Sequence, residues 1–241
     1  MTDAALAREI AQEAGALLLA IQSDGADGAR GDREANALII ERLRAARPED
    51  AILSEESADD LSRLEQRRVW IVDPLDGTRE FAEGRSDWAV HVALAIDGVP
   101  AVGAVALPGL GVTLATDAPP PLAAPHDPPR MLVSRTRPSQ LCENVIERIG
   151  AESLGMGSAG AKAMAVVRGE AEIYLHSGGQ HQWDNCAPAA VALAAGLHAS
   201  RIDGSPLVYN QRSTSIPDLL ICRKELAGTV LTAVAGCGEA G

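Results

Sequence analysis

The sequence predicts a mixed α/β protein in which helices and strands are layered. Its first half has two amphipathic helical patterns, at residues 4–21 and 32–47, followed by several strand-type runs. Its second half alternates short strands with helices. Between the halves, residues 117–130 include six prolines, a composition typical of a linker. We therefore expect an N-terminal half, 1–116, and a C-terminal half, 131–241, that together form one catalytic unit.

The composition is that of a soluble globular protein, with 241 residues, 46% of them hydrophobic, and a formal net charge of −12. Such acidity argues against a nucleic acid polymer as partner, although a single nucleotide is compatible with it. The longest early apolar run, 14–21, is too short to span a bilayer and lacks a preceding basic region, so we expect neither a membrane segment nor a signal peptide. The four cysteines form no C-x-x-C pair, which favours a reducing, cytoplasmic location.

The central motif is the apolar strand 69–72 and the turn that follows it, where Asp73 and Asp76 flank Pro74. A buried carboxylate costs several kcal/mol unless a cation or many donors compensate it. Two carboxylates at the end of an apolar strand therefore indicate a metal site.

A second acidic strand end precedes this motif. The short strand 51–53 runs directly into Ser54-Glu55-Glu56-Ser57. In a parallel or mixed sheet, Glu55 and Asp73 would come to the same edge. The alternative interpretation is a solvated acidic turn, which is the commoner meaning of such a cluster.

Asp32 follows the glycine-containing loop 22–31, where the second helix is expected to begin. Aspartate is a favoured N-cap residue, so a capping role is the simpler interpretation of Asp32. A role in the active site is the alternative.

The remaining elements follow from period and turn residues. We expect a short helix around 61–64, then a β-hairpin at 88–96 and 100–107 and a third strand at 112–116. Further strands are expected at 131–133, near 154, and at 171–175, 197–202 and 219–222, with a polar loop at 177–182. The expected helices lie at 141–149, from the glycine-containing segment 155–162 to residue 167, at 184–195 and from 225 onward.

Four carboxylates stand at strand ends or helix starts next to apolar segments: Glu55, Asp73, Asp76 and Asp184. The backbone carbonyl of Leu75 lies between two of them and is a natural further ligand. Hard oxygen ligands of this kind suit Mg²⁺. We expect Asp73 to bridge two ions.

Small residues with free backbone N–H groups occur at Gly77-Thr78 and at 157–160, and such groups bind phosphate at helix starts. A close-packed turn is the alternative for 157–160. Lys162 follows one helical turn later and could reach a second anionic group, or it could be an ordinary solvated lysine. Arg135 and Arg137 are further candidate contacts for an anionic substrate.

With W-I-V-D-P-L-D-G-T at 70–78, W-D at 183–184 and S-E-E-S at 54–57, the chain resembles the inositol monophosphatase superfamily over essentially its full length. This resemblance implies a layered α-β-α-β-α sandwich, a lithium-sensitive phosphatase, two or three Mg²⁺ ions and a homodimer.

The resemblance also assigns roles to residues. The implied set is Glu55, Asp73, Leu75, Asp76 and Asp184 as metal ligands, Asp32 and Thr78 as the pair that orients the attacking water, and Gly77, Thr78, Ser158 and Ala159 around the phosphate. The family usually has Thr-x-x-Asp where this chain has Ala29-Arg30-Gly31-Asp32, so the chain departs from the family pattern at Ala29.

Within the superfamily, the sequence is most similar to the 3'(2'),5'-bisphosphate nucleotidases of the CysQ type. D-G-T-R-E-F at 76–81 is close to their D-G-T-K-E-F, and Ser177 stands where inositol enzymes carry a glutamate. V-S-R at 133–135 and G-S-A-x-x-K at 157–162 imply that Ser134, Arg135 and Lys162 contact the substrate.

The expected reaction is therefore hydrolysis of the 3'-phosphate of adenosine 3',5'-bisphosphate to AMP, with the sulfated analogue as a further substrate. Inositol phosphate and fructose 1,6-bisphosphate are alternative substrates. A haloacid dehalogenase mechanism would need D-x-D-G-T, one residue shorter than the motif here, and uses a covalent aspartate. A metal-binding module without turnover is the non-enzymatic alternative.

Overall fold

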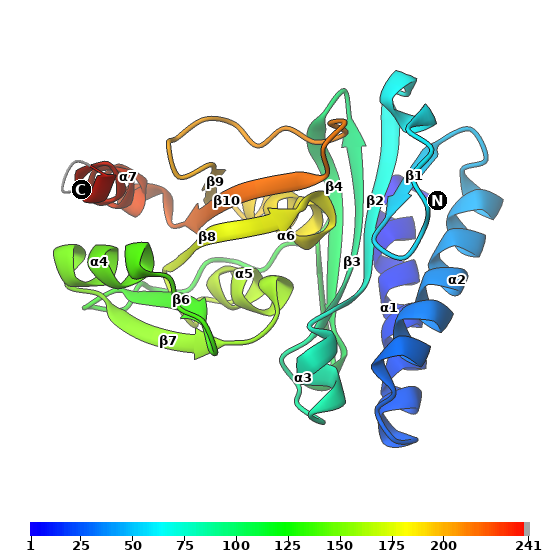
Figure 1. The fold of residues 1–241 in the computed structure, drawn as a ribbon, viewed down its shortest axis with the longest axis horizontal. Coiled ribbons are helices and arrows are strands. Elements are labelled where there is room, and N and C mark those ends of the chain that lie inside the picture. Colours follow the sequence, from blue (N-terminus) through cyan, green and yellow to red (C-terminus); the bar gives the residue numbers. More distant parts are fainter. Residues whose placement is uncertain (239–241) are drawn as a thin grey trace.

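The computed structural model describes residues 1–238, and these residues form five layers, alternately helical and β-sheet (Figure 1). The first half supplies two long helices, a five-stranded sheet and short helical turns. Their bounds are α1 Asp3–Ser23, α2 Gly28–Ala46, β1 Ala51–Ser54, η1 Ser62–Glu65, β2 Arg68–Asp76, α3 Thr78–Ala82, β3 Ala89–Ile96, β4 Val99–Leu107, η2 Pro108–Leu110 and β5 Val112–Ala115.

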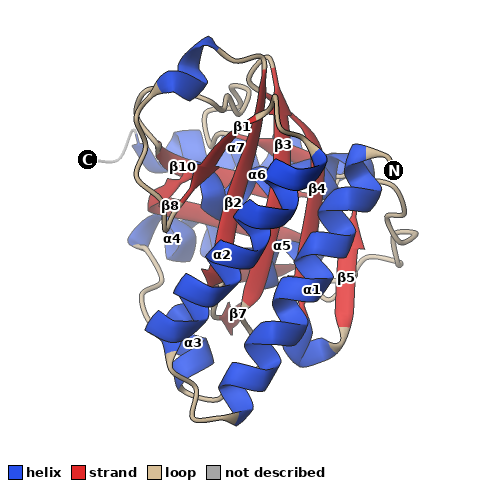
Figure 2. Ribbon diagram, turned by 90° about the vertical axis from the view of Figure 1, so that its right-hand side faces the viewer, coloured by secondary structure: helices blue, strands red, loops and turns tan. Residues whose placement is uncertain are grey.

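The first sheet has the order β1-β2-β3-β4-β5, with β1 parallel to β2 and all other neighbours antiparallel. Strand β2 is apolar throughout because both of its faces are covered. Trp70 and Val72 pack against α1 and α2, whereas Val69 and Ile71 face the opposite core. Figure 2 shows α1 and α2 lying across one face of this sheet.

The second half builds the other sheet, of order β7-β6-β8-β10-β9, in which β6 is parallel to β7 and β8. Its elements are β6 Arg130–Ser134, α4 Gln140–Ile149, β7 Glu152–Met156, α5 Ala159–Val167, β8 Ile173–His181, α6 Gln182–Ala194, β9 His198–Ser200, β10 Ser215–Cys222 and α7 Lys224–Gly238.

Three apolar cores hold the layers together. One lies between α1–α2 and the first sheet, one surrounds α5 and α6 between the two sheets, and one lies between the second sheet and α4–α7. The order of layers is therefore α-β-α-β-α, as the resemblance implied. The predicted fold class is confirmed.

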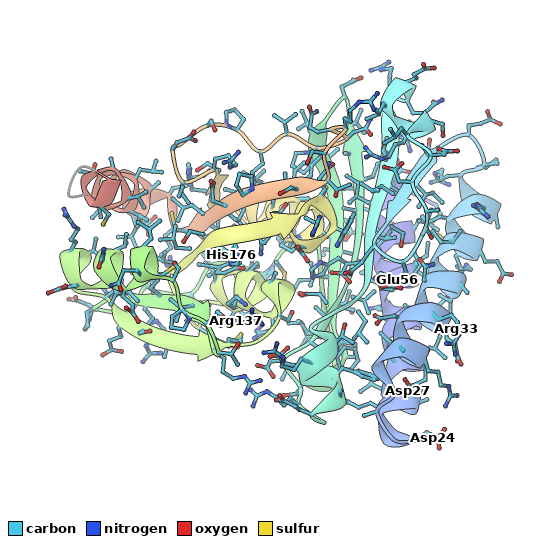
Figure 3. All side chains as sticks on the ribbon, viewed as in Figure 1. Asp24, Asp27, Arg33, Glu56, Arg137 and His176 are labelled. Carbon is cyan, nitrogen blue, oxygen red and sulfur yellow. The ribbon has the colours of Figure 1, made fainter. Side chains whose placement is uncertain are left out.

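Two local expectations were wrong. Helix α2 begins at Gly28 with Asp27 as its N-cap, whose carboxylate accepts from the Arg30 N–H at 3.1 Å, so Asp32 does not cap this helix (Figure 3). The expected loop 177–182 is mostly strand, because β8 continues to His181 and pairs with β10 despite its glycines. Strand pairing at the edge of a packed sheet overrides a local turn composition.

A bulge at Pro74 gives β2 its functional shape. The register pairs Asp73 with His91 and Asp76 with Ala89, and it shifts between them. In a regular strand, residues three apart point to opposite faces. The extra residue of the bulge brings Asp73 and Asp76 to the same side.

The segment between the halves is held by the buried carboxylate of Glu172. Its Oε1 accepts from the His126 backbone N–H at 3.0 Å, and its Oε2 accepts from the Arg130 N–H at 2.8 Å. A proline-rich stretch that forms few backbone bonds of its own is thus fixed to the second sheet. Among residues 1–238, no helix is long and apolar enough to cross a membrane.

Candidate active site

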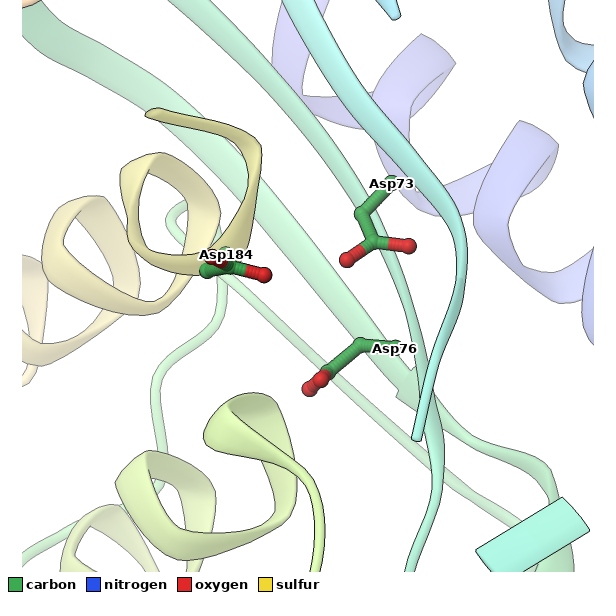
Figure 4. Close-up of side chains that lie close together, drawn as sticks. All are labelled: Asp73, Asp76 and Asp184. Carbon is green, nitrogen blue, oxygen red and sulfur yellow. The ribbon is translucent and has the colours of Figure 1, made fainter. Parts of the chain in front are cut away.

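Three carboxylates from distant parts of the chain converge between the two sheets (Figure 4). Asp73 and Asp76 come from the bulged end of β2, and Asp184 comes from the first turn of α6. One oxygen of each lies within 4.8 Å of one from each of the others. No lysine or arginine within residues 1–238 forms an ion pair with this cluster, so its negative charge is largely uncompensated.

Burial and mutual repulsion disturb the ionisation of two of these acids. Burial, reinforced by the charges of Asp76 and Glu55, holds the pKa of Asp73 well above its usual range. Burial and the charge of Asp76 raise the pKa of Asp184 to about 6. Groups that are costly to ionise together become favourable ligands when a cation sits between them.

Asp76 is the exception, because the start of α5 donates to it. The backbone N–H groups of Ala159 and Gly160 donate to its two oxygens at 3.2 and 2.6 Å, and the Ser158 hydroxyl donates as well. Burial alone would raise the pKa of Asp76, but the neighbouring His91, the Ser158 hydroxyl and the Gly160 N–H lower it to about 2. The N–H groups of Ala159 and Gly160, which belong to the segment 157–160 expected to bind phosphate, therefore donate to Asp76 in this structure.

His91 is a site residue that sequence reasoning missed. Its Nδ1 donates to the Trp183 carbonyl at 3.0 Å, so Nε2 faces Asp76 Oδ2 at 3.3 Å. Burial disfavours the charged ring, but the Asp76 carboxylate outweighs this and raises the pKa of His91. The available signal was a single polar residue in the otherwise apolar strand 88–96.

Glu55 and Asp32 form an acidic flank beside the cluster. The parallel pairing of β1 with β2 places Glu55 next to Asp73, as expected, although Glu55 also reaches solvent. Partial burial and the charges of Glu56 and Asp32 raise the pKa of Glu55. Partial burial and Glu56, which lies near α2 in Figure 3, raise the pKa of Asp32 to about 7.

Thr78 lies at the exposed start of α3, and its hydroxyl donates to the Leu75 carbonyl at 3.2 Å. The Thr78 hydroxyl is therefore bonded to the backbone and not to Asp32, the residue with which it is expected to orient the attacking water. The helices are nevertheless adjacent, because a Cβ added to Gly28 of α2 would lie 2.7 Å from the Thr78 methyl carbon. Asp32 is one helical turn further along α2.

A cavity of about 290 Å³ opens beside Asp76. Six of the predicted substrate contacts line it, namely Gly77, Thr78, Ser134, Arg135, Ser158 and Lys162, whereas Ala159 and Arg137 do not. Lys162 is not a solvated lysine, because it is buried and its Nζ donates to the carbonyls of Gly157 and Ser158. Burial lowers the pKa of this ammonium.

A comparison with protein families agrees with this geometry. The model of the inositol monophosphatase family matches residues 4–118 and 130–239, which is nearly the whole chain. The chain belongs to the inositol monophosphatase family. The resemblance inferred from the sequence motifs is confirmed.

Relatives of this family member include bacterial nucleotidases. A 3'-phosphoadenosine 5'-phosphate phosphatase of Mycobacterium bovis is 52% identical over 92% of this chain and 90% of its own length. The 3'(2'),5'-bisphosphate nucleotidase CysQ of Escherichia coli K12 is 29% identical over 80% and 83% of the two chains. The crystal structure of CysQ from Bacteroides thetaiotaomicron matches with a TM-score of 0.79 at 26% identity, covering 92% of this chain and 97% of that one.

Members of the inositol monophosphatase family are metal-dependent, and the donor set here fits that chemistry. Three carboxylate oxygens converge, no cationic side chain neutralises Asp73 or Asp184 within residues 1–238, and hard oxygen donors are those that divalent cations prefer. The cluster can therefore hold a divalent metal.

Proposed function

We propose that this protein is a Mg²⁺-dependent phosphatase that removes the 3'-phosphate of adenosine 3',5'-bisphosphate, producing AMP and inorganic phosphate. The observation that carries the substrate is the 52% identity to the phosphatase of M. bovis over nearly the full length of both chains. The carboxylate cluster beside a cavity supports the reaction class. The sulfated analogue of the substrate offers the same 3'-phosphate and is a second proposed substrate.

The proposed ligands of two or three Mg²⁺ ions are Glu55, Asp73, Asp76, Asp184 and the Leu75 carbonyl. Asp73 is suited to bridging, because its carboxylate lies beside Glu55 on one side and near Asp76 and Asp184 on the other. When bound, the ions neutralise charge on the phosphate and activate a water molecule. His91 and the start of α5 hold the Asp76 carboxylate in one orientation.

In the proposed reaction, a water oxygen forms a bond to phosphorus while the bond from phosphorus to the ribose 3'-oxygen breaks. Thr78 and Asp32 orient the water, and the Asp32 carboxylate accepts its proton. The ribose oxygen takes up a proton from solvent. Catalysis of this kind depends on positioning and on charge stabilisation more than on covalent chemistry.

The alternatives have less support. Ser177, where inositol enzymes carry a glutamate, has a hydroxyl and shares a 2.7 Å hydrogen bond with Ser139, so it offers no carboxylate to inositol hydroxyls. Membership of the inositol monophosphatase family argues against the haloacid dehalogenase mechanism.

The decisive experiment measures phosphate release by the purified protein with Mg²⁺ from adenosine 3',5'-bisphosphate, inositol 1-phosphate and fructose 1,6-bisphosphate. We expect the nucleotide to have the highest kcat/KM and a chelator to abolish turnover. Asp76→Asn should remove activity while the far-UV circular dichroism spectrum is retained. An active Asp76→Asn enzyme, or a preference for inositol phosphate, would contradict the proposal.

We further propose that 1–116 and 131–241, joined by 117–130, act as one catalytic unit, that the enzyme is a homodimer, and that it is cytoplasmic. The hydrogen bonds from Ser158, Ala159 and Gly160 to Asp76 support the first point, because they join the two halves at the site. Light scattering on the purified protein and cell fractionation test the other two.

A further inference from the structure

The cavity beside Asp76 is lined by three cationic side chains, Arg79, Arg135 and Lys162, and they differ in what already binds them. Arg135 Nη2 donates to Glu80 at 3.1 Å and to Glu83 at 2.9 Å, so two carboxylates hold its guanidinium. Lys162 is buried and donates to two carbonyls at the start of α5. Both side chains are part of the wall of the cavity.

Arg79 is different, because it is exposed and its only side-chain bond within the described chain is from Nη1 to the Thr136 hydroxyl, at 3.3 Å. No carboxylate of residues 1–238 forms an ion pair with it. Its guanidinium therefore has free N–H groups at the cavity wall opposite the β6 segment. A free guanidinium can bind a phosphate with two parallel hydrogen bonds.

The surroundings favour a free cation beside a doubly phosphorylated substrate. The site already contains the carboxylates of Asp73, Asp76 and Asp184, and Glu80 lines the same cavity. The metal-binding cluster accounts for one phosphate of the substrate. A second phosphate would meet mainly negative charge unless a cation faced it.

We propose that Arg79, assisted by the Thr136 hydroxyl, binds the 5'-phosphate of the substrate and so selects nucleoside bisphosphates over monophosphates. Arg79 is a specificity-determining residue in this proposal, which rests on the proposed nucleotidase function. The Arg79 side chain projects from α3, immediately after Thr78, so one short helix carries a group for each phosphate.

The test compares kcat/KM for adenosine 3',5'-bisphosphate with kcat/KM for adenosine 3'-phosphate, which has the same scissile group and no 5'-phosphate. Arg79→Ala should lower the value for the bisphosphate about 10- to 100-fold, mainly through KM. The value for the monophosphate should stay within about twofold. Arg79→Lys should fall between wild type and Arg79→Ala, because it keeps the charge and loses the planar fork.

Arg212→Ala is the matched control. Arg212 is an exposed arginine in the loop between β9 and β10, and it does not line the cavity. Its removal changes the net charge by the same amount as Arg79→Ala. Both substrates should keep their kcat/KM within about twofold.

Two kinds of result would contradict the proposed role of Arg79. Equal losses on the two substrates, or no loss on the bisphosphate, would show that Arg79 does not read the 5'-phosphate. A wild-type enzyme that hydrolyses neither nucleotide would overturn the proposed function, and this inference with it. If Arg79→Ala fails to fold, as judged by its melting curve, Arg79→Gln replaces it, since glutamine keeps part of the side chain and removes the charge.

Discussion

At the scale of single residues, the site depends on groups that orient the carboxylates. His91 joins the two signature motifs, because it contacts the carboxylate of Asp76 and the backbone of Trp183, the residue before Asp184. Its ring is completely buried, so water cannot replace these two contacts. A positioning role follows from this geometry.

We predict that His91→Ala weakens activation by Mg²⁺. Partners that orient metal ligands typically change metal affinity or activity by about 10- to 100-fold when removed. The Mg²⁺ concentration for half-maximal activity should rise by this factor, and His91→Asn should recover part of the loss, because asparagine can still donate to a carboxylate. His198→Ala, far from the cluster, is the control. An unchanged Mg²⁺ requirement in His91→Ala would reject the role.

At the scale of elements, α5 is positioned by a close approach to β3. A Cβ added to Gly160 would lie 2.1 Å from His91 Nε2 and 3.0 Å from the Ala89 side chain. Because both neighbours are buried, neither can move aside easily. The start of α5, which donates to Asp76, is fixed by this contact.

Gly160→Ala should therefore destabilise the protein by about 1–3 kcal/mol through overpacking and reduce activity. Gly228→Ala is the matched substitution. It lies in α7 with no atom within 4 Å of the new Cβ, so we expect a gain of up to about 1 kcal/mol from helix propensity. Urea unfolding measures both. Equal effects of the two substitutions would contradict the packing argument.

The proline-rich segment depends on Glu172. Two backbone N–H groups and the His126 ring bond to this buried carboxylate, and these bonds outweigh burial and lower the pKa of Glu172. Its contribution to stability is therefore present above the ordinary glutamate pKa, roughly 4.3. It is lost as pH falls through the lower pKa of the folded state.

Glu172→Gln should lower the free energy of unfolding by roughly 1.5–3 kcal/mol at neutral pH. The difference from wild type should shrink as the pH falls below about 4. Glu170→Gln, which removes one partner of an exposed ion pair with Arg168, should cost less than about 1 kcal/mol. Chemical denaturation as a function of pH gives these values. A difference that grows toward low pH would contradict a lowered pKa for Glu172 in the folded protein.

At the scale of the whole molecule, the arrangement that suits a divalent cation lowers the stability of the metal-free protein. The two halves bring Asp73, Asp76 and Asp184 together although their charges repel, and the apolar cores on both sides of the first sheet supply the opposing free energy. A site that is poised for a cation is a local cost to the metal-free fold.

Asp73→Asn should therefore melt at a higher temperature than wild type in the presence of a chelator, by roughly 2–4 °C for each kcal/mol of repulsion removed. The amide oxygen can still accept the Leu75 N–H, which donates to Asp73 at 3.0 Å. Saturating Mg²⁺ should raise the melting temperature of wild type and have a smaller effect on Asp73→Asn. Asp203→Asn, on the surface, should show the wild-type response to Mg²⁺. A less stable metal-free Asp73→Asn would refute this account.

Much of this protein follows from its sequence alone. The spacing of the apolar residues predicts α1, and a continuous apolar run predicts β2. Two carboxylates that directly follow an apolar strand indicate a metal site, so Asp73 and Asp76 were candidate ligands without a structure. The family motifs then indicated the layered fold.

The tertiary structure decided which donors serve which acceptors. The N–H groups at the start of α5 donate to Asp76, and Arg135 pairs with Glu80 and Glu83. Asp27, and not Asp32, is the N-cap of α2. The tertiary structure also placed His91 against Asp76 and left Arg79 free of any ion pair within residues 1–238. Most of these contacts join residues far apart in the chain, as Arg135 to Glu80 and Gly160 to Asp76 do. Local periodicity fixes which face a side chain occupies, but only the packing of distant elements determines what it meets there.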